Sequence, residues 1–184
     1  MDQGKEYYEM YKSGDGAALE WLVHEYRRGL ILYLYGIVGD MFAAEDLCED
    51  AFFRLIAKKP AFDGRCSFKT WFFGIGRNLA LDYQRHAGCL PRAGLSDIEA
   101  EADKTSLEAQ YIKGEREKVL LSKLKDLPEK DRELIWLTYF EGLSAKETAR
   151  LTKKTVTGVN KALSRARKQL RIMMEREGYG NEDR

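Results

Sequence analysis

Apolar residues recur at a helical period along most of the chain, and no convincing series of β-strands interrupts them. In the first half this pattern predicts helices over residues 17–38, 43–58 and 67–85, separated by the short breaks "GDM" and "PAFDGRC". The stretch "AGCLPRAGLSDIEAEADK" then mixes glycines, a proline and acidic residues without a sustained apolar stripe, which is typical of a linker.

The second half also has helical punctuation. Pro128 fits the first turn of a helix that ends at Glu141, and Gly142 fits its C-terminal stop. Ser144 and Glu147 have the spacing of a capping box and predict a short helix, followed by a break at "TKKT" and a longer helix. The apolar positions of that longer helix that we expect to face inward are Val156, Val159, Leu163 and Leu170. Ala166 belongs to the same apolar pattern.

The predicted fold class is therefore all-α, with two helical domains joined by a flexible acidic linker and a helix-turn-helix in the C-terminal domain. We expect the first domain to span residues 1–87, the linker 88–106 and the second domain 107–184. With 44% hydrophobic and 33% charged residues, the composition suits a globular protein. No apolar run approaches 18 residues and no secretory leader is evident, so we expect a cytoplasmic protein without membrane insertion.

The three cysteines lack the C-x-x-C spacing and the histidine neighbours of a zinc site, so we expect no metal, cofactor or disulfide framework. His24 and His86 are isolated in the sequence, and no Ser/His/Asp or phosphate-loop constellation is present. We therefore expect no enzymatic activity and no catalytic residues.

Charge is segregated along the chain although the net charge is only +1. Residues 145–177 carry ten basic and three acidic side chains, whereas residues 95–110 carry five acidic and one basic. A short helix, a turn and a long basic helix favour DNA binding by a helix-turn-helix, with the second helix in the major groove. A partner-binding or membrane-surface helix is the alternative. The outward face predicted to bind DNA comprises Thr157, Asn160, Lys161, Ser164, Arg165 and Lys168.

The helix over residues 43–58 carries an unusual acidic face. Glu45 and Glu49, and likewise Asp46 and Asp50, stack one turn apart, which costs a few tenths of a kcal/mol per pair. Phe53 lies among these acids. The pattern indicates either a surface for a basic or mixed partner or a merely acidic exposed face.

The segment "CSFKTWFFGIGRNLALDYQRH" contains two glycines that suggest a dinucleotide-binding loop, but the third glycine is missing and no strand precedes it. A helix capped by Ser67 accounts for the residues better, with an apolar stripe through Phe68, Trp71, Phe72, Ile75, Gly76, Leu79 and Tyr83. This stripe leaves Phe73 as an exposed aromatic between Lys69 and Arg77, an arrangement suited to stacking on a single-stranded base. A partner-facing aromatic is the alternative.

These segments, in this order, make the chain resemble a bacterial sigma factor of the extracytoplasmic-function group. The family pattern "D-A-E-D-L-x-Q-E-x-F" corresponds to "AAEDLCEDAF", and "F-x-G-x-S-S-F-x-T-W-L-Y-R-I-A-R-N" corresponds to "FDGRCSFKTWFFGIGRN". The "L-P-x-x-x-R-E" and "G-L-S-x-x-E-I-A" patterns correspond to "LPEKDREL" and "GLSAKETA". The resemblance covers about residues 5–175.

The resemblance implies an RNA polymerase sigma factor that directs the core enzyme to promoters and assists promoter melting. The implied partners are the clamp coiled coil and flap of core RNA polymerase, promoter DNA and an anti-sigma factor. The implied polymerase-binding residues are Glu45, Asp46, Leu47, Glu49, Asp50 and Phe53. The implied minus-ten residues are Asp63, Gly64, Arg65, Cys66, Ser67, Lys69, Thr70, Phe73, Arg77 and Asn78. The minus-thirty-five element would be read by the outward face of the last helix, and the acidic linker would follow the RNA-exit path.

Several positions depart from the family pattern: Glu49 and Asp50 replace the usual Gln-Glu pair, and Thr157-Gly158 inverts the usual Gly-Thr. Gly74 and Gly76 replace a usual basic residue and alanine, and Lys154 and Thr155 replace a usual apolar residue and proline. These differences could alter promoter preference. The main alternative function is a helix-turn-helix transcriptional regulator that does not bind core polymerase, although it leaves the acidic helix without a role.

Overall fold

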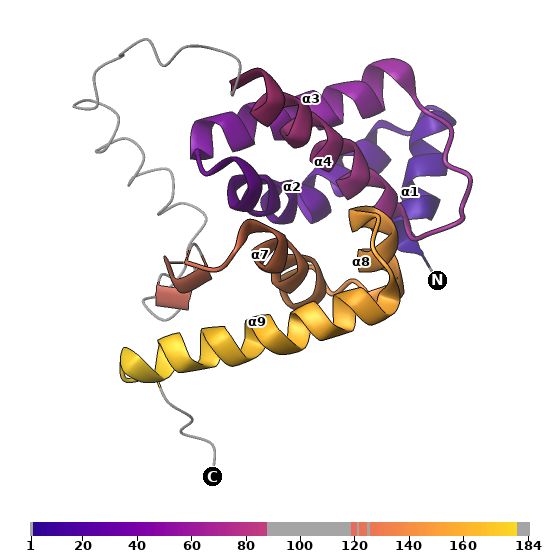
Figure 1. Cartoon of the computed structure of the whole chain (residues 1–184). Helices are drawn as coiled ribbons and strands as arrows, with labels where there is room; N and C mark the ends of the chain where they lie inside the picture. Colours follow the sequence, from indigo (N-terminus) through magenta and orange to yellow (C-terminus); the bar gives the residue numbers. More distant parts are fainter. Residues whose placement is uncertain (1, 88–118, 121, 125, 180–184) are drawn as a thin grey trace, which may run out of the picture. The chain divides into compact units, whose positions relative to one another are not determined.

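The computed structural model describes residues 2–87, 119–120, 122–124 and 126–179. The chain divides into two compact units, Met1–Leu107 and Glu108–Arg184. Every regular element of the described ranges is helical, as the sequence predicts. Figure 1 labels these helices in chain order. The predicted linker, residues 88–106, lies outside the described residues.

The described part of the first unit, residues 2–87, contains the helices α1 (Gln3–Lys12), α2 (Gly16–Val38), α3 (Met41–Lys58) and α4 (Phe68–Ala87). The last three agree with the predicted helices to within two residues at each end. α1 was not predicted. Helix α2 packs against each of the other three helices, and α4 contacts α1, α2 and α3. Both α2 and α4 are therefore covered on more than one side.

Asp2 joins the start of α1 to the start of α4. One carboxylate oxygen accepts a hydrogen bond from the Lys5 amide (3.3 Å) and the other accepts one from the Phe68 amide (2.6 Å). Amides in the first turn of a helix have no intrahelical partner, so one aspartate satisfies donors of two helices. Gly4 lies at the same junction, where a Cβ atom would stand 2.4 Å from the Tyr26 hydroxyl oxygen. A side chain at position 4 would therefore displace the Tyr26 or Phe68 side chain.

Aromatic rings fill much of the core of the first unit. Phe72 of α4 lies 4.8 Å from Phe52 of α3 and 6.2 Å from Tyr26 of α2, measured between ring centroids. The Tyr8 hydroxyl donates a hydrogen bond to the Pro60 carbonyl (2.7 Å), so the buried phenol keeps a polar partner. Burial raises the pKa of Tyr8 to about 12.

The second unit contains α7 (Glu129–Ile135), a π-helical segment η1 (Trp136–Phe140), α8 (Ala145–Thr152) and α9 (Val156–Arg176). Pro128 lies at the N-terminus of α7, and Gly142 has a φ of 70°, in agreement with their predicted roles. The π-helical segment was not predicted. It stacks Trp136 on Phe140 with ring centroids 4.4 Å apart, and the Trp136 indole donates to Glu141 (3.3 Å).

Helices α8 and α9 form the predicted helix-turn-helix. Ser144 and Glu147 make the capping box, with the Glu147 amide donating to Ser144 Oγ (3.3 Å) and the Ser144 amide donating to the Glu147 carboxylate (3.0 Å). Lys153 ends α8 in the left-handed conformation, and Thr155 caps α9 by accepting a bond from the Gly158 amide (3.1 Å). The helical break at "TKKT" is thus confirmed.

The inward face of α9 differs from the prediction at one end. Val159, Leu163 and Ala166 are buried, and Leu170 is half-buried. Val156 was predicted to face inward, but it is exposed: it is the first residue of α9, so no preceding turn of that helix covers it. No helix among the described residues is long and apolar enough to cross a membrane.

Candidate nucleic-acid and partner interfaces

The predicted acidic face lies on α3. Asp46, Glu49, Asp50 and Phe53 are exposed, and 66% of the surface of Phe53 is accessible to solvent. Such exposure of a large aromatic among carboxylates favours a protein partner over an idle surface. Glu45 is half-buried, and one carboxylate oxygen lies 3.7 Å from the Arg27 guanidinium. Leu47 is buried and supports this face from the core.

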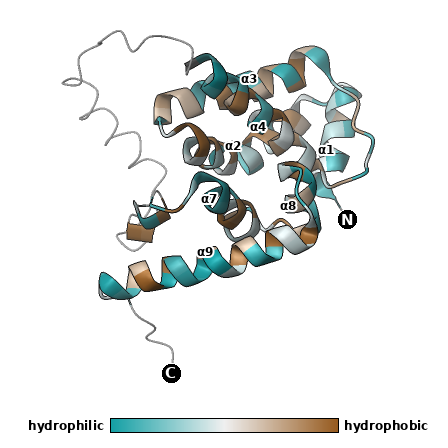
Figure 2. Ribbon diagram, in the orientation of Figure 1, coloured by the Kyte–Doolittle hydropathy of each residue, from teal (hydrophilic) through white to brown (hydrophobic). Residues whose placement is uncertain are grey.

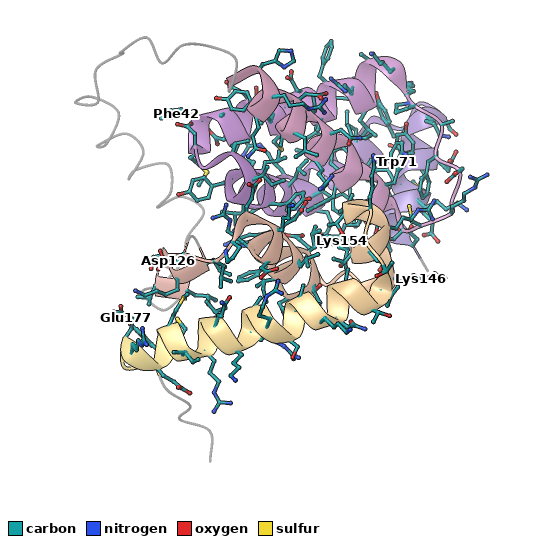
Figure 3. The ribbon with its side chains drawn as sticks, in the orientation of Figure 1. Phe42, Trp71, Asp126, Lys146, Lys154 and Glu177 are labelled. Carbon is teal, nitrogen blue, oxygen red and sulfur yellow. The ribbon has the colours of Figure 1, made fainter. Side chains whose placement is uncertain are left out.

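The exposed face of α3 extends beyond the predicted residues. Phe42 and Ile56 are also exposed, one turn or more from the ends of the acidic cluster. Phe42, Asp46, Glu49, Phe53 and Ile56 recur at i, i+4, i+7, i+11 and i+14 and form one row. Figure 3 labels Phe42, which lies at the N-terminal end of α3. We name this row, together with Asp50, the α3 face.

Cys48 lies under the α3 face. Its thiol is buried and donates a weak hydrogen bond to the Arg27 carbonyl oxygen, with Sγ 3.8 Å from that oxygen. Burial raises the pKa of Cys48 to about 12, against the smaller lowering effect of the Arg27 charge. This thiol is therefore an inert packing residue at neutral pH.

Phe73 is fully buried, and the prediction of an exposed aromatic at this position is wrong. Its ring centroid lies 5.5 Å from that of Tyr33 in α2, and Lys69 Nζ lies 5.5 Å from the Phe73 centroid. Thr70, also among the predicted minus-ten residues, is buried, and its hydroxyl lies 2.8 Å from Ser67 Oγ. Neither side chain lies on an open surface for nucleic acid.

The prediction failed because it assigned a single narrow stripe to α4. The helix packs on three others, so its buried arc is wide and includes Phe68, Phe72, Phe73, Gly76, Leu79 and Ala80. Tyr83, predicted in the stripe, is exposed instead, and Trp71 and Ile75 are half-buried. The open side of α4 is thus rotated away from Phe73 and toward Trp71 and Asn78.

The loop before α4 presents polar groups in a defined geometry. Asp63 Oδ1 accepts a bond from the Arg65 amide (3.0 Å), and Asp63 Oδ2 lies 3.2 Å from Arg65 Nε. Gly64 has a φ of 68°, which favours glycine between them. Ser67 Oγ accepts a bond from the Thr70 amide (3.3 Å), which confirms Ser67 as the cap of α4. Cys66 is half-buried.

Among the remaining predicted minus-ten residues, Asp63, Gly64, Arg65 and Asn78 are exposed, and Lys69 and Arg77 are half-buried. Trp71 was missed as a surface candidate because the pattern placed it in the core. Its ring touches Tyr8 and Phe62, with centroids 5.5 and 5.2 Å away. Trp71 is labelled in Figure 3.

Gly76 permits close packing on α2 rather than an approach of nucleic acid. A Cβ atom at this position would stand 2.8 Å from Leu30 Cδ1 and 3.5 Å from Leu34 Cδ2. Glycine in place of the usual alanine at position 76 therefore allows α4 to pack tightly against α2.

The predicted outward face of α9 is exposed throughout. Figure 2 shows the largely hydrophilic character of this helix. Its exposed predicted residues are Thr157, Asn160, Lys161, Ser164, Arg165 and Lys168. Arg165 differs from the others because its guanidinium is bound to Asp131 of α7 by three hydrogen bonds of 2.8–3.1 Å. No cluster of three metal-ligating side chains occurs in the part of the chain that the structure describes.

Two family models match the chain. The model of sigma-70 region 2 matches residues 22–88, and that of sigma-70 region 4 matches residues 117–170. Together they span about two thirds of the chain, one in each compact unit.

Curated relatives match over nearly the full length. The ECF RNA polymerase sigma factor SigW of Bacillus subtilis is 28% identical over 169 residues, covering 87% of this chain and 90% of that protein. The RNA polymerase sigma-H factor of Pseudomonas aeruginosa is 27% identical over 181 residues, covering 92% and 93% respectively.

Solved structures share the fold. CnrH, solved in complex with the cytosolic domain of CnrY, aligns with a TM-score of 0.67 at 24% identity over 95% of this chain and 98% of that chain. The sigma factor RpoE of Bartonella quintana, solved with the anti-sigma factor NepR, aligns with a TM-score of 0.60 at 20% identity, covering 84% and 91%.

Proposed function

The chain belongs to the sigma-70 family as an extracytoplasmic-function sigma factor of RNA polymerase, and on this premise we propose which surfaces perform each step of initiation. The observation that carries the proposal is that one chain has both an acidic, aromatic face on α3 and a basic, exposed face on α9. A DNA-binding regulator that does not bind polymerase would need only the second of these faces.

The α3 face binds core RNA polymerase at the clamp coiled coil. Phe53 supplies an exposed apolar anchor, and Asp46 and Asp50 supply negative charge beside it. An aromatic anchor surrounded by charges combines affinity with orientation, because burying the ring provides energy and the charges select a complementary surface. Phe42 and Ile56 enlarge the apolar part of this contact. The second unit contacts the flap.

The loop at residues 63–67 and the open side of α4 bind the minus-ten element. Arg65 supplies positive charge and Asn78 supplies hydrogen-bonding groups, while half-buried Lys69 and Arg77, one turn on either side of Phe73, add positive charge at the edge of this surface. With Phe73 in the core, Trp71 is the aromatic that this side offers for stacking on an unpaired base, a contact worth about 1–3 kcal/mol. With Trp71 in this role, Phe73 does not have to leave the core for promoter melting.

The outward face of α9 reads the minus-thirty-five element in the major groove. Side chains such as Thr157, Lys161 and Ser164 can donate hydrogen bonds to base edges, and each good contact discriminates by about 1–3 kcal/mol. The chain contributes no catalytic group, since phosphodiester chemistry belongs to the polymerase. It works in the cytoplasm with that enzyme. By analogy with RpoE bound to NepR, an anti-sigma factor is a further partner.

Co-purification with core RNA polymerase tests the proposal. Charge reversal at Asp46 and Asp50, both to lysine, is expected to abolish binding to core while circular dichroism stays unchanged. A matched double reversal at Glu20 and Glu25, which are exposed acids on α2, serves as the control for net charge and should bind normally. Normal binding by the Asp46, Asp50 variant would remove the α3 face from the proposal.

A further inference from the structure

A groove of about 490 Å³ runs between the first turn of α7 and the N-terminal half of α9. One wall is a single row of α9, in which Gly158, Ala162, Arg165 and Gln169 recur at i, i+4, i+7 and i+11. The opposite wall and the end are formed by Pro128, Lys130, Asp131, Lys154 and Thr155. Two exposed lysines and one arginine therefore border the groove. Figure 3 labels Lys154, which lies in the turn before α9.

The Arg165 guanidinium is held in this groove by Asp131. Arg165 Nη2 donates to both carboxylate oxygens at 2.8 Å, and Nε donates to Oδ2 at 3.1 Å. The Asp131 side chain is only 6% exposed, whereas that of Arg165 is 63% exposed. A buried carboxylate that accepts such a fork fixes the plane of the guanidinium, while Nη1 takes no part in the pair.

The place of Arg165 on α9 separates it from the residues expected to read bases. Thr157, Lys161, Ser164 and Lys168 also recur at i, i+4, i+7 and i+11, but their row lies opposite the buried face of α9. The Arg165 row lies on the flank that faces α7. When a helix occupies the major groove, its central face meets base edges and its flanks meet the sugar–phosphate strands.

We infer that Arg165, positioned by Asp131 and assisted by Lys130 and Lys154, binds a DNA phosphate beside the minus-thirty-five element instead of reading a base. Asp131 is a positioning residue in this arrangement. The inference rests on the proposed function of α9, and it reassigns Arg165 from base recognition to backbone binding. The groove suits a phosphate because three cations and one acid line it, which leaves a net charge of +2 after the Arg165–Asp131 pair is formed.

Holoenzyme assembled from the full chain and core polymerase provides the test, with affinity measured on a matched promoter and on promoters carrying single minus-thirty-five substitutions. Arg165→Ala is expected to weaken binding to all of them by the same factor, roughly tenfold, the effect of one charge-assisted hydrogen bond. The slope of log affinity against log salt should shrink by about 1. Lys161→Ala, in the base-reading row, should instead reduce the ratio between matched and substituted promoters.

Two further variants test the role of Asp131. Asp131→Asn removes the carboxylate that fixes the plane of the Arg165 guanidinium, so it should lower affinity on every promoter. Because Arg165 keeps its charge, the salt slope should stay unchanged. In an Arg165→Ala background the same change should have no further effect on DNA affinity, because there is no guanidinium left to position. Thermal unfolding of each variant is measured first, and the binding assays are run at a temperature at which all variants are folded. Arg176→Ala, on the last residue of α9, is the matched arginine control and should leave affinity and slope close to wild type.

A selective loss of minus-thirty-five discrimination by Arg165→Ala would overturn the inference and return Arg165 to base reading. An additive effect of Asp131→Asn in the Arg165→Ala background would show that Asp131 only holds α7 to α9. Either result leaves the proposed function intact, since wild-type holoenzyme still selects promoters. Failure of the wild-type chain to bind core or to discriminate promoters at all would instead contradict the proposed function.

Discussion

Replacing Phe73 with alanine is expected to destabilise the first unit strongly. The ring is fully buried, packs against Tyr33 and lies under the Lys69 ammonium group. Removing a buried phenylalanine side chain typically costs about 3–5 kcal/mol, because the lost apolar contacts leave a cavity. Since domains of this size unfold with about 5–15 kcal/mol, the variant should lose a large part of its stability.

Urea unfolding followed by tryptophan fluorescence can isolate the first unit. The chain has three tryptophans, and Trp136 is the one in the second unit. In a Trp136→Phe background, the signal of Trp21 and Trp71 therefore reports on the first unit alone. The midpoint for Phe73→Ala should fall well below that of the parent, with a similar slope against urea concentration.

Phe53→Ala is the matched control, because it makes the same chemical change at a ring that is 66% exposed. Its unfolding free energy should stay within about 0.5 kcal/mol of the parent, while its binding to core polymerase should weaken. An unchanged midpoint for Phe73→Ala, together with a specific defect in promoter opening, would refute the assignment of Phe73 to the core.

Two other predictions concern stability and thiol chemistry. Gly4→Ala should destabilise the first unit in the same urea assay, because the new Cβ would collide with the Tyr26 hydroxyl. As the control, Gly36→Ala adds a Cβ with no neighbour within 4 Å and should stabilise the unit by about 0.4–1 kcal/mol. Equal effects of the two changes would contradict the close approach at Gly4. In a Cys89→Ser background at pH 8, Ellman's reagent should label half-buried Cys66 and spare Cys48 until the protein unfolds. Burial raises the pKa of Cys48 to about 12, so only about one Cys48 thiol in ten thousand is ionised at this pH. Rapid labelling of Cys48 in the folded protein would show that it is accessible.

Local signals explain which parts of the fold were predictable. The capping box at Ser144, the Ser67 cap and the stop at Gly142 depend on residues a few positions apart, so the sequence indicates them directly. The bounds of α2, α3 and α4 follow from long apolar stripes for the same reason. The acidic row on α3 was predictable because like charges one turn apart have no benefit within the helix itself.

The failures have long-range causes. Helix α1 is capped by Asp2, whose other carboxylate oxygen accepts a hydrogen bond from an amide 66 residues away in the sequence, and no local pattern reveals that link. The rotation of α4 depends on three helices covering it at once, which buries Phe73 and opens the side of Trp71. The pairing of Asp131 with Arg165 joins residues 34 positions apart, so the sequence placed Arg165 among the base-reading residues.

Transcription by purified core RNA polymerase from a library of randomised promoters tests the central claim most directly. With the wild-type chain, we predict that transcripts arise from a small set of templates that share two sequence elements at a constant spacing, and that core alone yields none of this enrichment. The Asp46, Asp50 charge-reversal variant should lose the enrichment, and the Glu20, Glu25 control should keep it. If the wild-type chain binds DNA but neither associates with core nor enriches any promoter, the assignment of a sigma-factor function to these surfaces is wrong.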